Sequence, residues 1–257
     1  MRSPFCKSLG LPTTILPRLS IAHSAHRRPP PPPPSSSSSL SSPRRRPLST
    51  TPPLTMRLPY APTEAPTEAS PSNPDPEATA AIYARIAERR RPRPLIPLDL
   101  ALLHSPPVAD GWNSFLGAIR TKTVVDEAVL ELAVSRVGAL TDAVWEWRAH
   151  AALAAKAGVP RAVLEWCLKK VPVEEAGEAV EGLGEKEKAV IRYADAMTKE
   201  VKVPQDVFDG LKPFFSEREI VELTTAVAAY NCVSRFLVAL DVGEMNGKEM
   251  EVPPEAK

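Results

Sequence analysis

Apolar residues recur at spacings of three and four from residue 76 onward, without any run of strict alternation. This period is typical of amphipathic helices rather than strands, so it predicts an all-α fold. Proline and glycine mark the helix ends, because proline suits a first helical turn and glycine a left-handed stop. The pattern predicts helices at residues 76–91, 106–120, 124–138, 142–157, 160–170, 185–200, 204–212 and 216–240. We therefore expect one helical domain at residues 76–245 and a short tail at 246–257.

Formal charge is distributed unevenly along the chain. Residues 1–63 contain nine basic and no acidic residues, so the total charge of +1 leaves residues 64–257 at −8. An acidic domain repels phosphate, which argues against a nucleic-acid partner. No run approaches the roughly 18 apolar residues that a membrane span needs, so no span is expected.

The N-terminal segment has the composition of a targeting sequence. Residues 1–55 are rich in arginine and serine and lack acidic residues, which is typical of a mitochondrial presequence. Residues 29–42 are low-complexity proline and serine. We expect residues 1–75 to form a disordered extension. The expected location is the mitochondrial matrix if the extension is made, and the cytoplasm if translation starts at Met56.

The three cysteines, Cys6, Cys167 and Cys232, are widely separated and form no CxxC pair. This spacing excludes a disulfide framework and a cysteine-rich zinc site, and it indicates a reducing compartment. We expect neither a metal nor another cofactor.

Glu131 and His150 form the strongest candidate site. They lie at equal distances from a turn that Gly138 and Thr141 place between two predicted helices. If these helices fold back as an antiparallel hairpin, the two side chains face each other. A carboxylate beside an imidazole favours the protonated ring, which suits proton transfer near neutral pH. The pair could instead be a structural hydrogen bond that only orients two helices, and the spacing leaves both interpretations open.

Four further residues are candidates for substrate binding. Trp147 lies beside His150 on one helical face, and Glu146 lies one turn before it, although a tryptophan here could also be core. Asn231 and Arg235 share a stripe of an otherwise apolar helix, where an arginine needs an anion or a carbonyl group. Arg235 is either an anchor for a substrate carboxylate or the partner of a structural group.

Residues 127–165, EAVLELAVSRVGALTDAVWEWRAHAALAAKAGVPRAVLE, resemble a known helical hairpin. It is that of the carboxymuconolactone decarboxylase and alkylhydroperoxidase D-like superfamily, in which a glutamate precedes a histidine by nineteen residues. Glu131 and His150 occupy these positions, and Gly158-Val159-Pro160 follows as in the family. The resemblance covers roughly residues 95–243. It implies an alkylhydroperoxidase D-like helical bundle that assembles as a homo-oligomer, a trimer or a hexamer.

The chain departs from the peroxidase branch of this superfamily. That branch carries CxxCxxxH, whose two cysteine positions correspond here to Ala143 and Glu146. Attack on a peroxide needs a thiolate and a resolving sulfur, so alkylhydroperoxide reductase activity has the least support.

The branch without these cysteines implies a cofactor-free lyase or isomerase for a small carboxylated lactone or keto acid. In that chemistry His150 would be the proton donor, Glu131 would orient it, and Arg235 would anchor the substrate carboxylate. The alternative is a non-catalytic helical oligomer that binds a ligand without turnover. The sequence does not separate these two functions.

Overall fold

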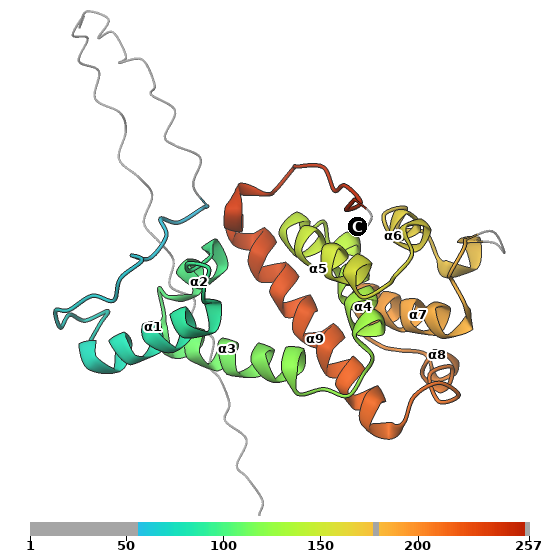
Figure 1. The fold of residues 1–257 in the computed structure, drawn as a ribbon, viewed down its shortest axis with the longest axis horizontal. Helices are drawn as coiled ribbons and strands as arrows, with labels where there is room; N and C mark the ends of the chain where they lie inside the picture. The colour runs from blue at the N-terminus through green and yellow to red at the C-terminus, as the bar shows by residue number, and fades with distance from the viewer. Residues whose placement is uncertain (1–55, 177–179, 255–257) are drawn as a thin grey trace, which may run out of the picture. The chain divides into compact units, whose positions relative to one another are not determined.

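Helices form the regular secondary structure of residues 56–176 and 180–254, the part of the chain that the computed structural model describes (Figure 1). The α-helices are α1 (Pro76–Arg90), α2 (Pro97–Leu102), α3 (Pro106–Thr121), α4 (Glu127–Leu140), α5 (Val144–Lys156), α6 (Arg161–Cys167), α7 (Glu185–Lys199), α8 (Gln205–Asp209) and α9 (Glu217–Leu240). Two 3-10 helices, η1 (Val173–Ala176) and η2 (Val242–Glu244), complete the order. The prediction of an all-α fold is confirmed for these residues.

All eight predicted helices are present, and local contacts explain where they begin. The Ser216 hydroxyl accepts from the backbone N–H of Glu219, whose carboxylate accepts from the Ser216 N–H at 2.8 Å, so the predicted capping box is confirmed. Thr141 lies at the predicted turn and belongs to the end of the first helix of the hairpin. It closes α4 by donating its hydroxyl to the Val137 carbonyl oxygen at 2.8 Å, and α5 begins only at Val144.

Helix α2 was not predicted, because it is short and lies between closely spaced prolines at positions 92, 94 and 97 and at 106 and 107. Pro97 opens it, and the Asp99 carboxylate accepts from the Ile96 N–H at 3.0 Å. The same carboxylate accepts two hydrogen bonds from Arg90, at 2.6 and 2.8 Å. One buried aspartate therefore starts α2 and ties it to the end of α1.

Helix α4 is the central helix of the described part. Every residue from Val129 to Ala139 is buried, and α4 packs against α5, α7 and α9. Its side chains enter two hydrophobic clusters, one with residues of α1, α3 and α9 and the other with residues of α5 and α6. A helix buried on all sides is typical of a protein core.

Arg136 is a fully buried charge within α4, and Asp195 of α7 neutralises it. Its Nε and Nη2 atoms donate to the two Asp195 carboxylate oxygens at 2.6 and 2.8 Å. Nη1 and Nη2 also donate to the carbonyl oxygens of Cys167 and Val171, and the guanidinium lies 4.8 Å from the Trp166 ring centroid. Arg136 therefore joins α4, α6 and α7, because a buried charge needs such partners.

Residues 56–75 pack against the helices, so the prediction of disorder for residues 1–75 is wrong for this part. Met56 is 2 % exposed, and the Arg57 N–H donates to the Leu240 carbonyl oxygen. The Tyr60 hydroxyl donates to the Glu244 carboxylate at 3.0 Å. The proline-rich composition did not indicate this order, because it depends on contacts with distant residues. Residues 1–55 lie outside the described residues.

Residues 246–254 lie along α5 and α6 rather than forming a separate tail. The Trp147 indole N–H donates to the Glu251 carbonyl oxygen at 2.8 Å, and Arg161 donates to that of Pro253 at 3.0 Å. The helical domain therefore extends beyond residues 76–245 at both ends.

Helix α9 has 24 residues and is the one described helix that is long and apolar enough to cross a membrane. The sequence contains no unbroken run of about 18 apolar residues, and α9 qualifies only on average because residues such as Thr224, Asn231 and Arg235 interrupt its apolar ones. Core helices have the same length and composition, and α9 buries Leu223, Val227 and Tyr230 while packing along α4 (Figure 1). Much of its apolar surface is thus used inside the domain.

Candidate functional site

Glu131 and His150 meet across the α4–α5 hairpin, as their spacing predicted. His150 Nδ1 lies 2.7 Å from Glu131 Oε2, and each residue is 7 % exposed. The hydrogen bond fixes the orientation of the ring and, through Nδ1, the role of its other nitrogen. Within the described residues, His150 Nε2 has no hydrogen-bond partner.

Tyr230 of α9 holds the other side of the imidazole. Its ring packs edge-on against His150, with centroids 4.6 Å apart. Its hydroxyl accepts from Arg120 Nε at 2.8 Å. Burial raises the pKa of Tyr230 to about 12, although Arg120 opposes the shift, so the hydroxyl stays neutral at neutral pH. The ring therefore links His150 to an arginine.

A cavity of about 620 Å³ lies beside His150. Its wall combines Glu146 and His150 with Trp145 from α5, Leu237 from α9 and Met245 after η2. Small-molecule sites in proteins measure roughly 300–1,000 Å³ and are largely apolar with a few polar groups. The cavity therefore has the size and the lining of a site for a small molecule.

Arginine is the main charged component of this cavity, which is lined by Arg89, Arg90, Arg93, Arg120 and Arg148. Arg90 is paired with Asp99, and Arg89 contacts the same carboxylate at 3.4 Å. Within the described residues, Arg93, Arg120 and Arg148 have no carboxylate partner. Burial lowers the pKa of Arg89, and neighbouring Arg90 and Arg120 add to the effect while Asp99 opposes it. The excess of positive charge suits an anionic ligand.

Glu146 is the acidic residue on the wall. It is 1 % exposed, and neither carboxyl oxygen has a hydrogen-bond partner among the described residues. Burial raises its pKa well above the usual value, and Arg120 and Arg235 only partly oppose this. The prediction that Glu146 lies beside the site agrees with its place in the cavity.

Trp147 is a core residue and not part of the cavity wall, so its prediction as a substrate-binding residue is wrong. Its side chain is fully buried in the cluster that α5 forms with α6, and its indole N–H donates to the Glu251 carbonyl oxygen. Trp145 lines the cavity instead. The helical period placed Trp147 near His150, but only the packing decides which tryptophan faces a cavity.

Asn231 and Arg235 bind each other, so the structure does not support their prediction as substrate-binding residues. Arg235 Nη1 donates to the Asn231 side-chain oxygen at 2.6 Å and to its carbonyl oxygen at 2.8 Å. Asn231 Nδ2 donates to Thr198 at 3.0 Å. Neither residue lines the cavity beside His150. Arg235 therefore fits the alternative interpretation, in which it is the partner of a structural group.

Sequence reasoning missed the arginines of the cavity. A signal was present, since RRRPRP at residues 89–94 places four arginines within six residues. Arg120 and Arg148 carried no such signal, because they come from α3 and α5 and meet the others only in the folded chain.

The described cysteines do not replace the missing CxxC pair. Cys167 is fully buried, and burial raises the pKa of its thiol to about 12. A thiol with that pKa is a poor nucleophile. Cys232 is exposed on α9. In the described part of the chain, no group of three histidine, cysteine or acidic side chains could hold a metal ion.

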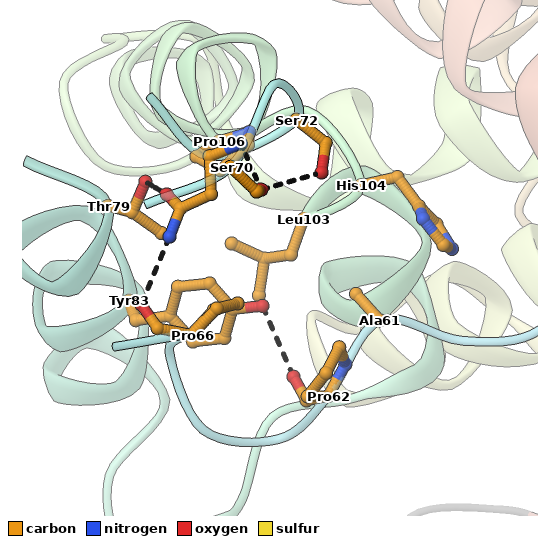
Figure 2. Close-up of a pocket in the computed structure, with 11 residues that line it drawn as sticks. Ala61, Pro62, Pro66, Ser70, Ser72, Thr79, Tyr83, Leu103, His104 and Pro106 are labelled. Atoms are coloured by element: carbon orange, nitrogen blue, oxygen red, sulfur yellow. Dashed lines mark hydrogen bonds between the residues drawn. The ribbon is translucent and has the colours of Figure 1, made fainter. Parts of the chain in front are cut away.

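A second cavity of about 200 Å³ lies under residues 61–73 (Figure 2). Its polar groups satisfy one another. Asn73 Nδ2 donates to the carbonyl oxygens of Pro66 and Glu68, and its side-chain oxygen accepts from Thr79 at 2.7 Å. The Tyr83 hydroxyl donates to the Pro62 carbonyl oxygen at 3.2 Å (Figure 2). These hydrogen bonds therefore anchor the N-terminal segment to the helices.

The chain was compared with known protein families, curated proteins and solved structures. No family model matches the chain, and no curated protein matches it. The chain is similar to the crystal structure of a protein of unknown function from Agrobacterium tumefaciens, described as a candidate antioxidant defence protein AhpD. The TM-score is 0.46 at 20 % identity, over 58 % of this chain and 94 % of that one. At this level of similarity the neighbour carries no argument about function.

Proposed function

We propose that this chain is a cofactor-free lyase or isomerase that acts on a small carboxylated lactone or keto acid. One observation carries the proposal. His150, held through Nδ1 by Glu131 at 2.7 Å, lines an arginine-rich cavity of about 620 Å³ with no described partner at Nε2. A basic or acidic ring nitrogen at an anion-binding wall is suited to proton transfer on a bound acid.

Different residues of the cavity have different roles in a decarboxylation. The N–H groups of Arg93, Arg120 and Arg148 bind the substrate's acidic groups. Arg235 does not take this role, because its guanidinium is hydrogen-bonded to Asn231. As carbon dioxide leaves, its bonding electron pair forms an enolate with the neighbouring carbonyl group. His150 in its protonated form then transfers a proton from Nε2 to the carbanionic carbon. Glu131 orients the ring for this transfer through its hydrogen bond to Nδ1.

A second candidate function is ligand binding without turnover. The observation that favours it is the burial of both Glu131 and His150, because a buried pair can be purely structural. Peroxide reduction has no support, since Ala143 and Glu146 stand where the cysteines of the peroxidase branch would lie.

The test is a screen of cyclic and β-keto acids for release of carbon dioxide, comparing the wild type with His150→Ala. We expect the variant to lose at least about 100-fold in kcat, the usual contribution of a positioned proton donor. His104→Ala is the matched control, because His104 is exposed and its Nε2 contacts the Pro59 carbonyl oxygen outside this cavity. Full activity in His150→Ala would remove His150 from the mechanism. Binding of an acid by the wild type without turnover would favour the second candidate function.

We also propose a homo-oligomer and, for the chain with residues 1–55, import into the mitochondrial matrix. Large apolar side chains at Val108, Phe115, Val124 and Val221 are 49–64 % exposed, which supports an interface between copies. Light scattering tests the first proposal. Tagging the full chain and a form that starts at Met56 tests the second, since only the full chain should enter the organelle.

A further inference from the structure

We propose that Glu146 is a second proton donor of this site, acting as a neutral carboxylic acid on the oxygen of the enolate that forms in the reaction. This inference rests on the proposed function and extends it to a residue that a single histidine mechanism leaves unused. It also gives a role to the position that a cysteine occupies in the peroxidase branch.

The burial of Glu146 is the first support. The side chain is 1 % exposed, and both carboxyl oxygens are without hydrogen-bond partners among the described residues. An ionised carboxylate in such a place would lose its hydration without any compensating hydrogen bond, whereas the neutral acid costs far less. The direction of its pKa, raised by burial, agrees with this.

The position of Glu146 is the second support. It lines the same cavity as His150 and lies one helical turn before it on α5. His150 Nδ1 is already bonded to Glu131, so the histidine has only Nε2 to offer a ligand. Two separate proton donors therefore border one cavity, and each can serve a different atom of the substrate.

The charges around Glu146 come from several helices and have opposite effects on its proton. The groups are Arg89 and Arg90 of α1, Arg120 of α3, Glu131 of α4, Arg148 and His150 of α5, and Tyr230 and Arg235 of α9. The arginines favour the ionised form, although burial is the larger effect. After Glu146 has given up its proton, these arginines stabilise the carboxylate, which makes the transfer reversible.

The step is balanced in protons and electron pairs. When the bond to the departing carboxylate breaks, its electron pair forms a carbon–carbon double bond and the carbonyl pair moves to oxygen. Glu146 protonates that oxygen, which gives an enol and a Glu146 carboxylate. His150 then protonates the carbon, while the enol O–H returns its proton to Glu146. Water restores the proton on His150, so the net change is one proton taken up and one carbon dioxide released. A neutral carboxylic acid that donates to a developing oxyanion is an established device in enzymes.

The direct experiment is infrared difference spectroscopy of the wild type against Glu146→Gln at neutral pH. We expect the carbonyl band of a protonated carboxylic acid in the wild type and its loss in the variant. We also expect oxaloacetate, acetoacetate or malonate to shift this band, because the acid O–H then bonds to the added compound. Glu165→Gln is the matched control, since Glu165 is exposed and paired with Arg161. Absence of the band, or a band that none of the three compounds shifts, would overturn the proposal.

Turnover separates this inference from the proposed function. If the wild type releases carbon dioxide from a compound, Glu146→Gln should lower kcat about 100-fold with little change in KM, because the amide cannot give up a proton. Unchanged kcat in that variant would overturn the role of Glu146 and leave His150 in place. If the wild type turns over none of the acids, the lyase proposal fails, and the infrared band and its shift still decide whether Glu146 donates to a bound acid.

Discussion

Gly138 of α4 lies directly against the backbone of Trp147 in α5. A Cβ atom at Gly138 would be 3.0 Å from the Trp147 nitrogen and 3.3 Å from its Cα. Both are backbone atoms, so they cannot move aside as the end of a side chain can. The close approach of the two helices, and with it the contact between Glu131 and His150, depends on the missing side chain at this position.

Gly138→Ala should therefore separate the hairpin. We expect a loss of about 1–3 kcal/mol in the free energy of unfolding, as for other overpacked cores, together with reduced activity. Gly117→Ala is the control, because a Cβ at Gly117 of α3 meets nothing within 4 Å. There alanine should stabilise the helix by about 0.5–1 kcal/mol. Chemical denaturation of both variants measures the difference, and equal stability of the two would contradict the role of Gly138.

The buried acid Glu146 should make stability depend on pH. Because burial raises the pKa of Glu146 in the folded state above its ordinary value of 4.5, the folded state holds this proton more tightly than the unfolded state. The contribution of this proton to the free energy of unfolding is complete below pH 4.5 and is lost as the pH rises through the pKa of Glu146 in the folded state. The wild type should thus lose stability relative to Glu146→Gln from about pH 4.5 upward, by at most about 1.4 kcal/mol per pH unit. Denaturation curves between pH 4 and 8 test this, and parallel pH profiles for the two proteins would exclude it.

Arg93 offers a test of the anion-binding wall. It lines the cavity, and its side chain has no partner among the described residues. Arg93→Gln should leave stability unchanged and raise KM for an acidic substrate about tenfold, which corresponds to about 1.4 kcal/mol of binding. The same change at Arg161, which lies outside the cavity and pairs with Glu165, should leave KM unchanged. Similar KM values for the two variants would argue that the cavity does not bind the substrate.

The two tryptophans of α5 should respond differently to removal of their rings. Trp147→Ala removes a fully buried side chain and should cost about 3–5 kcal/mol in stability. Trp145 is half-buried, lines the cavity and packs against Gly243. Trp145→Ala should cost less stability and mainly alter KM. Thermal unfolding and steady-state kinetics measure both effects. A change in KM for Trp147→Ala and a larger loss of stability for Trp145→Ala would contradict these assignments.

Much of the fold could be predicted from the sequence because it depends on short-range regularity. The helical period, the prolines of the first turns and the capping box at Ser216 act within a few residues of one another, so the eight predicted helices followed from them. The contact between Glu131 and His150 also followed, because one short turn determines which residues of a hairpin lie level. Helix α2 was missed because it is a short helix in a proline-rich stretch, where prolines at 92, 94 and 97 favour a loop.

The composition of the cavity was decided by the tertiary structure. Its arginines come from α1, the segment after α1, α3 and α5, and no local sequence pattern predicts that these segments meet. Asn231 and Arg235 had the right spacing for a site but satisfied each other, and Trp147 turned toward the core while Trp145 faced the cavity. Sequence spacing determines which face of a helix a residue occupies. What that face meets depends on contacts between distant segments, which form only when the whole core packs.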